Sequence, residues 1–283
     1  MYYLPILGAI ALATATIMQR MILKKKNIKI KFYKSAEFLA IVLASLPILY
    51  FFWRIDSGAF SLKNILIFVL VIVFSIIANI LTYYSMKWEK VSNLEPAKML
   101  EQLFVIIFAI IFSFLFEGLY ERNFNIIIPA LIAAGALVFS HIKRYHLDFN
   151  KYFIAAIVGS IFFALELIIS RLILDYYSPV TFYFLRCISI AILSTIIFRP
   201  KYQKLENKVK WQILAIGAIW VIYRVAIYYG YLYLGVVSTT LMIMLGPIFI
   251  YLFAWKFLKE KLSWRNIVAA VVILACILYA TLG

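Results

Sequence analysis

The stretch ILGAIALATATIMQRMIL, residues 6–23, returns in the second half of the chain as IVGSIFFALELIISRLIL, residues 157–174. The two stretches match without gaps at eight of eighteen positions, including a glycine at the third position and an arginine at the fifteenth. Apolar helices resemble one another in composition, but a shared glycine and a shared arginine near the end are harder to explain in that way. Because an internal repeat constrains the whole architecture, we interpret the chain as two copies of one unit.

The composition predicts that this unit lies in a membrane. Of the 283 residues 66% are hydrophobic and 14% are charged, and the mean hydropathy is +1.00, far above that of an ordinary soluble domain. A spanning helix needs about 20 mostly apolar residues. Ten such segments follow one another, at residues 4–23, 33–53, 63–86, 93–116, 124–142, 150–174, 179–198, 210–233, 236–257 and 264–282. The short connections leave no room for a soluble catalytic domain, so any site must be formed by the helices themselves.

A second pair of similar segments closes each half. SFLFEGLYERNF around Glu117 resembles KFLKEKLSWRNI around Glu260, and each acid follows one long apolar segment and precedes the next. Each half therefore holds five helices, and an odd number means that the second copy enters the membrane from the opposite side. We expect an all-α membrane protein with ten transmembrane helices in two inverted five-helix repeats, residues 1–146 and 147–283.

The net charge of +16 is better explained by membrane topology than by nucleic-acid binding, because the basic residues are spread over short loops. The connection after the first helix carries a charge of +6, that after the seventh +4 and that after the ninth +3, whereas those after the second, sixth and eighth carry almost none. Basic loops stay in the cytoplasm. This rule places the odd-numbered loops inside and both termini outside.

Two segments of the second half carry a family resemblance. SPVTFYFLRCISIAIL (178–193) has a proline near its start and an arginine seven residues later, and residues 236–274 contain a mid-helix Gly-Pro and a closing glutamate. In these features the chain resembles the EamA-like ten-helix members of the drug/metabolite transporter superfamily. The resemblance implies an integral multi-pass protein of the plasma or inner membrane that transports small metabolites, with both termini in the cytoplasm. The orientation from the charge rule is the reverse.

Polar residues open the fourth helix, in the stretch EPAKMLEQLF at residues 95–104. Glu95, Lys98 and Gln102 fall on one helical face, and Glu101 lies close to it. A helix that begins at the interface explains Glu95, which suits the positive end of the helix dipole, but it explains Glu101 poorly. A charge deeper in the bilayer persists only where it faces the protein interior or a wet cavity.

The eighth helix carries the sharpest signal. Arg224 lies fourteen residues after Lys210 and nine before Tyr233, so it should be near mid-membrane. Amphipathic aromatic residues surround it at helical spacing, namely Trp220, Tyr228 and Tyr231. A substrate role and a structural ion pair are both open; the candidate partners are Glu95, Glu101 and Glu166.

Two further charges lie in the sixth and seventh helices. Glu166 is deep in its helix and has Ala15 opposite it in the repeat, so it is not part of a duplicated scaffold. A buried carboxylate of this kind suits proton coupling. Arg186 is about two turns into its helix, and we interpret it as structural because the loop beyond is within reach.

The leading hypothesis is a secondary transporter and not an enzyme. It moves small polar or charged organic metabolites, such as amino-acid-like compounds, by alternating access, with protons as the coupling ion. Its substrate-binding candidates are Arg224, Lys98, Gln102, Trp220, Tyr228, Asn79 and Tyr83. Its coupling candidates are Glu101, Glu95 and Glu166. We expect no catalytic residue, metal, cofactor or nucleic-acid partner, and a lipid bilayer around the chain. The sequence leaves the oligomeric state open and is compatible with a monomer. The alternatives are a lipid-processing membrane enzyme, whose polar residues would gather near one interface, and a membrane module that transports nothing.

Overall fold

The computed structural model describes residues 3–23, 28–88, 91–116, 118–141, 150–200, 203–258 and 264–282. Nine segments of this part of the chain are helices long and apolar enough to cross a bilayer, and α5 is a shorter tenth. The helices are α1 (Tyr3–Leu23), α2 (Ile30–Phe52), α3 (Leu62–Trp88), α4 (Val91–Leu115), α5 (Phe124–His141), α6 (Lys151–Arg171), α7 (Pro179–Phe198), α8 (Asn207–Tyr233), α9 (Val236–Ile243), α10 (Leu245–Leu258) and α11 (Trp264–Leu282). The predicted ten-helix membrane fold is confirmed.

The ninth predicted span is interrupted, because α9 ends at Ile243 and α10 begins at Leu245. Pro247 has no backbone N–H to donate to the carbonyl four residues earlier, so the helix breaks one turn before it. The neighbouring Gly246 allows close packing, since a Cβ there would lie 2.7 Å from Leu12 Cδ2 of α1. The broken helix therefore rests against the first helix of the other half.

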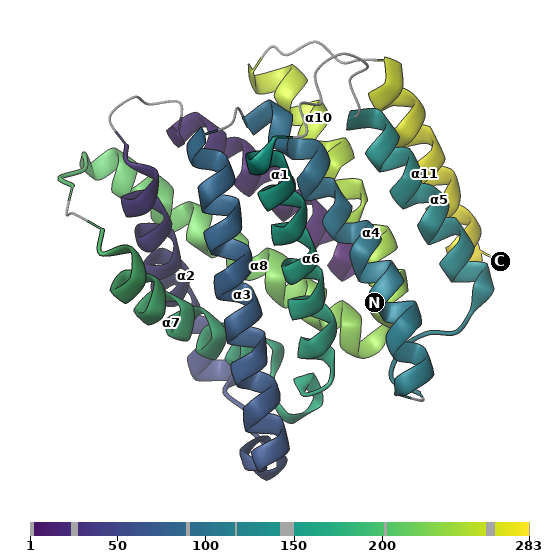
Figure 1. The fold of residues 1–283 in the computed structure, drawn as a ribbon, viewed down its shortest axis with the longest axis horizontal. Helices are drawn as coiled ribbons and strands as arrows, with labels where there is room; N and C mark the ends of the chain where they lie inside the picture. Colours follow the sequence, from purple (N-terminus) through teal and green to yellow (C-terminus); the bar gives the residue numbers. More distant parts are fainter. Residues whose placement is uncertain are drawn as a thin grey trace.

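The helices pack in pairs that the repeat predicts (Figure 1). The most extensive contacts join α3 to α6 and α1 to α8, and exchanging the two halves turns the first pair into the second. The pairs α2–α7 and α5–α11, which the same exchange leaves unchanged, form opposite edges of the bundle. The packing therefore follows the two-fold relation expected of inverted repeats.

The connections divide by charge between the two sides of the bundle. One side of the bundle, which we call the basic side, holds the C-terminal ends of α1, α3, α5, α7 and α10. Its described basic residues include Lys29, Lys31, Arg199, Lys204, Lys208, Lys210 and Arg265. On the opposite side, cations are balanced by acids, as where Arg54 pairs with Asp56 at 2.9 Å. The odd-numbered loops therefore share one side, and the positive-inside rule predicts that it faces the cytoplasm.

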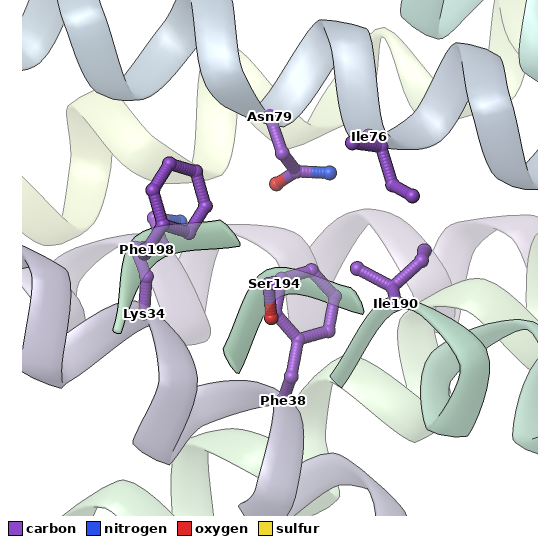
Figure 2. Close-up of a pocket in the computed structure, with 7 residues that line it drawn as sticks. All are labelled: Lys34, Phe38, Ile76, Asn79, Ile190, Ser194 and Phe198. Atoms are coloured by element: carbon purple, nitrogen blue, oxygen red, sulfur yellow. The ribbon is translucent and has the colours of Figure 1, made fainter. Parts of the chain in front are cut away.

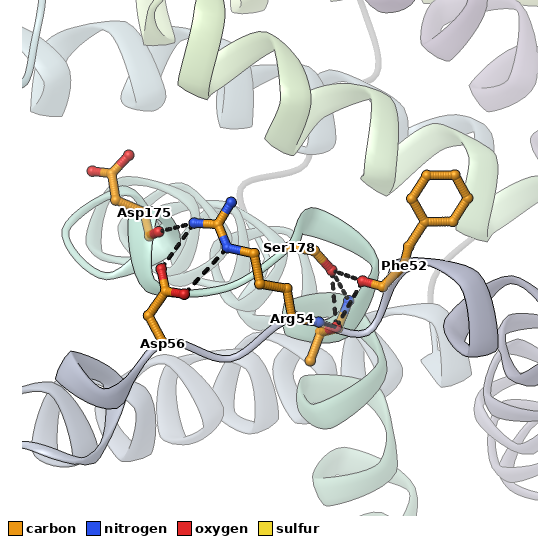
Figure 3. Close-up of polar contacts among 6 residues, drawn as sticks. Phe52, Arg54, Asp56, Asp175 and Ser178 are labelled. Atoms are coloured by element: carbon orange, nitrogen blue, oxygen red, sulfur yellow. Dashed lines mark hydrogen bonds and ion pairs between the residues drawn. The ribbon is translucent and has the colours of Figure 1, made fainter.

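A hydrogen-bonded clamp joins the end of α2 to the start of α7 on the side opposite the basic side (Figure 3). Ser178 caps α7 by accepting from Thr181 N at 3.1 Å, while its hydroxyl donates to Phe52 O. Arg54 donates through Nη2 to Asp175 O at 2.9 Å, and its backbone N–H donates to Thr181 Oγ1 at 3.1 Å. The serine of the family-like stretch thus fixes two helix ends with one side chain.

A second contact on that side joins the two halves through Glu121, in the connection before α5. Its carboxylate accepts hydrogen bonds from the backbone N–H groups of Val236, Val237 and Ser238 at 2.9–3.1 Å. These are free donors of the first turn of α9, where a negative charge also complements the helix dipole. Gly235, with φ of +88°, gives the carboxylate access, because a Cβ there would lie 2.1 Å from Glu121 Oε1.

Candidate functional site

The centre of the bundle holds one carboxylate between two guanidinium groups. Glu166 of α6 is fully buried, at 0% exposure. Its Oε1 lies 2.9 Å from Arg186 Nε of α7, and its Oε2 lies 3.7 Å from Arg224 Nη2 of α8. We call Glu166, Arg186 and Arg224 the central ion cluster. Since removing one partner of a buried ion pair leaves an uncompensated charge, the three side chains depend on one another.

Hydrogen bonds from three elements orient the carboxylate and its closer cation. Arg186 Nε lies 3.0 Å from Ser75 Oγ of α3. Tyr228 donates its hydroxyl to Glu166 Oε1 at 3.3 Å, and Ser170 Oγ lies 3.4 Å from the same oxygen. The site is thus built where α3, α6, α7 and α8 meet.

Helical spacing explains why these side chains converge. Ser170 is four residues after Glu166, and Tyr228 is four residues after Arg224, so each pair lies on one face of its helix. On α7, the Ser178 cap and Pro179 fix the first turn, which places Arg186 seven residues inside the helix. The capped start of α7 therefore sets the depth of its cation.

Tyrosine rings line the two cations. The Arg186 guanidinium lies 5.9 Å from the ring centroid of Tyr183, and that of Arg224 lies 5.9 Å from the ring of Tyr223. Tyr228 also packs edge-on against Phe182 at 5.2 Å. Aromatic faces attract cations, so the rings hold the guanidinium groups and add apolar surface around them.

Some polar atoms of the site have no hydrogen-bond partner among the described residues. They are Arg224 Nη1 and Glu166 Oε2; Gln102 Oε1 of α4 is likewise buried without such a partner. Arg224 itself is only 8% exposed. A buried donor without a partner is costly unless water or a ligand satisfies it. Among the described contacts, Arg224 therefore keeps an unsatisfied donor, and its ion pair with Glu166 is longer than that of Arg186.

Helix α4 contributes the second acid. Glu101 is partly buried and interacts electrostatically with Arg224, Glu166, Arg186 and Lys98. Ser160 fastens α4 to α6 by donating to Ala97 O at 2.8 Å. Glu101 of the predicted polar start is thus within electrostatic reach of the central ion cluster.

The other sequence-predicted residues divide into three groups. Trp220 lies one turn from Arg224 but donates Nε1 to Glu37 Oε1 at 3.0 Å. Asn79 bonds to Ser75 O of its own helix and lines a separate cavity of about 10 Å³ between α2, α3 and α7 (Figure 2). That volume is about the room of one water. The side chains of Tyr83 and Glu95 lie outside the described part of the structure.

The interpretation of Arg186 as a structural residue that reaches the loop was wrong about its place. Arg186 is 3% exposed and binds Glu166 inside the bundle. Sequence reasoning also missed Ser75, Tyr183 and Tyr223. The family-like stretch SPVTFYFLR was the available signal for Arg186 and Tyr183, because it places the arginine at the depth where Glu166 lies on the neighbouring helix.

Comparison with known proteins agrees with the predicted fold. A solved protein crystal structure has a TM-score of 0.75 to this chain at 14% sequence identity, and the alignment covers 99% of this chain and 96% of that one. This likeness shows the fold. No curated protein matches the sequence. The model of the EamA-like transporter family matches residues 150–282. The resemblance inferred from the sequence is thereby confirmed for the second half, where residues 150–282 of this multi-pass membrane protein match the EamA-like transporter family.

Proposed function

We propose that the protein is a secondary transporter in which two inverted halves, residues 1–146 and 147–283, enclose the central ion cluster and open alternately to each side. The observation that carries the proposal is the depth and burial of that cluster. Arg224 lies 17 residues after the start of α8 and 9 before its end. A charge at that depth costs about 2.5–3.5 kcal/mol on insertion scales, so it is retained where it has a task or a partner.

The cluster suggests the chemical class of the substrate. Arg224 presents a donor with no hydrogen-bond partner among the described residues, and arginine favours carboxylate and phosphate. Glu101 offers a negative charge on the adjacent helix, and the tyrosines offer faces for an organic body. An amino-acid-like metabolite, with an anionic group on Arg224 and an amine near Glu101, satisfies both signs.

The burial of the cluster also favours a carrier over a lipid-processing enzyme. An enzyme that acts on lipid head groups needs an acid and a base that the head groups can reach, whereas Glu166 is fully buried, at 0% exposure. We infer proton coupling through Glu101, because it is the acid of the site without a close ion pair in the described contacts. One chain supplies both halves, so we propose that a monomer in the cell membrane suffices.

Unequal packing of equivalent helix pairs supports alternating access. The repeat relates α2–α8 to α7–α3, yet α2 packs extensively along α8 while α3 touches α7 sparsely. On the basic side, a buried cluster that includes Tyr33, Val209 and Ile213 closes the α2–α8 contact. A carrier held in one state is expected to have one such contact closed and its equivalent loose.

Purified protein in proteoliposomes tests the proposal. A thermal-shift screen against amino acids, phosphorylated metabolites and neutral sugars should show stabilisation by the first class, since a ligand of the folded state raises its apparent stability. Uptake of a ¹⁴C-labelled amino-acid mixture should then exceed that of empty liposomes under an imposed proton gradient. Stabilisation by neutral sugars alone would reject the anionic substrate class.

A further inference from the structure

A second buried carboxylate, which the sequence did not single out, lies on α2. Glu37 is 4% exposed, although it is only seven residues from the start of its helix. Its two oxygens have different partners: Oε2 is 3.1 Å from Lys34 Nζ, and Oε1 accepts the Trp220 indole N–H at 3.0 Å. An ion pair at i, i+3 is a common and weak feature of helices, but it does not require the second bond, which crosses to α8.

The backbones of α2 and α8 approach each other closely near the bond to Trp220. A Cβ on Gly217 would lie 2.7 Å from the carbonyl carbon of Ala40, so the two backbones touch there. Gly217 is one turn before Trp220, and Ala40 is one turn after Glu37. The bond thus joins α2 to α8 within about one turn of this close backbone approach on each helix.

From Trp220 the contacts continue to the central ion cluster. The indole packs edge-on against Tyr223 at 5.4 Å, and the Tyr223 ring carries the Arg224 guanidinium at 5.9 Å. Trp220 is itself partly exposed, unlike Tyr223, Tyr228 and Tyr231 on the same helix, which are buried. The orientation of one indole thus sets the ring beside the cation that keeps an unsatisfied donor among the described contacts.

Glu37 is not a remnant of the repeat. On the alignment that places Gly8 with Gly159, residue 37 corresponds to Ile188, which has no carboxylate. The acid therefore occurs in one half only, on the side where the equivalent helices are closely packed.

We propose that Glu37 is a positioning residue for the transport site: its carboxylate holds the Trp220 indole so that Trp220 and Tyr223 form the wall of the site on the basic side and orient Arg224. This inference rests on the proposed transport function for its effect on uptake. The position of the indole follows from the bond itself and is measurable without a substrate.

The test separates the acceptor from the charge. Glu37→Gln keeps an oxygen that accepts the indole N–H, Glu37→Ala removes it, and Trp220→Phe removes the N–H but keeps a ring. The protein with 5-fluorotryptophan has six ¹⁹F signals, one for each tryptophan, and the Trp220 signal is assigned by its loss in Trp220→Phe. We expect Glu37→Ala to shift this signal and Glu37→Gln to leave it near its original position.

Uptake of the ¹⁴C-labelled amino-acid mixture gives the functional readout. We expect Glu37→Ala and Trp220→Phe each to raise the half-saturating concentration about tenfold, as the loss of one hydrogen bond allows, with an unchanged maximal rate. The double variant should be no worse than either single one, because both remove the same bond. Glu37→Gln should restore the wild-type value.

Three results would overturn the proposal: an unmoved Trp220 signal in Glu37→Ala, a Glu37→Gln variant as impaired as Glu37→Ala, or additive effects in the double variant. If Glu37→Ala does not fold, the other two variants still test the proposal. The Glu37–Trp220 hydrogen bond requires Trp220→Phe to impair uptake and Glu37→Gln to preserve it. If the wild type takes up none of the mixture, the proposed substrate class fails, while the ¹⁹F signal still decides the role of Glu37.

Discussion

The guanidinium of Arg186 lies 2.9 Å from the carboxylate of Glu166, and no other ion pair among the described residues has both side chains so completely buried. The pair joins α6 to α7, within the second half. Arg224 reaches the same carboxylate at 3.7 Å. Arg186 therefore interacts more strongly than Arg224 with the Glu166 carboxylate, and replacing the two arginines should have unequal effects.

Replacing the shared acid should destabilise the fold. Glu166→Gln leaves two buried guanidinium groups without their anion, which should cost about 3–5 kcal/mol. Thermal unfolding in detergent, followed by size-exclusion chromatography, measures the loss. Ser75→Ala is the matched control, because it removes one neutral hydrogen-bond partner of Arg186 and should cost about 1 kcal/mol. Equal melting temperatures for the two variants would contradict the account of the cluster.

Stability and transport should respond differently to the two arginines. Arg186→Gln should lower the melting temperature more than Arg224→Gln, since Arg186 makes the shorter ion pair and also contacts Ser75. Arg224→Gln should remove stabilisation by amino acids in the thermal-shift assay while the protein stays folded. If Arg224→Gln keeps the ligand response of the wild type, Arg224 is structural rather than a ligand of the substrate.

Neutralising the second acid should uncouple transport. Glu101→Gln should abolish accumulation of the ¹⁴C-labelled mixture under a proton gradient, because the amide cannot take up a proton. Exchange of substrate between the two sides should persist in the absence of a gradient. Asn79→Ala is the control, since Asn79 lines the separate cavity beside Lys34 and Ser194, and it should leave both activities unchanged. Unchanged accumulation in Glu101→Gln would remove this residue from the mechanism.

The clamp between α2 and α7 should contribute to stability. Ser178→Ala removes both the cap of α7 and the donor to Phe52 O, and the cap alone is worth about 0.5–2 kcal/mol. Ser189→Ala on the same helix is the control, because Ser189 bonds only to Leu185 O within its own helix in the described contacts. We expect the melting temperature to fall in the first variant and to change little in the second; the reverse order would contradict the clamp.

The sequence was sufficient to predict where the helices begin and end, because bilayer thickness sets their length. Helices α4, α7 and α11 begin and end within two residues of the predicted spans, and Pro247 marks the break between α9 and α10. The sequence determines the rotation of a helix about its own axis less well than it determines the ends of the helix. Helix α3 is apolar on all sides, so nothing in its sequence indicated that Asn79 faces α2 and α7 rather than the central ion cluster.

The sequence did not determine which side chains on different helices contact one another. Arg186 and Glu37 both lie near helix ends, where a charge is ordinarily explained by the interface. Their roles depend on which helices pack against them, Glu166 of α6 in one case and Trp220 of α8 in the other. Glu166 itself was found because Ala15 stands opposite it in the repeat, so a duplicated scaffold does not explain the acid.

The most direct measurement of the central claim is the access of water to the cluster from each side of the membrane. The sequence has two cysteines, Cys187 and Cys276, so replacing both gives a background in which Gln102→Cys, one residue after Glu101, is the single thiol. A charged methanethiosulfonate reagent that cannot cross the bilayer should label Gln102→Cys from one side, and a stabilising amino acid should change the rate. No labelling from either side, with or without the amino acid, would contradict a wet chamber that opens alternately.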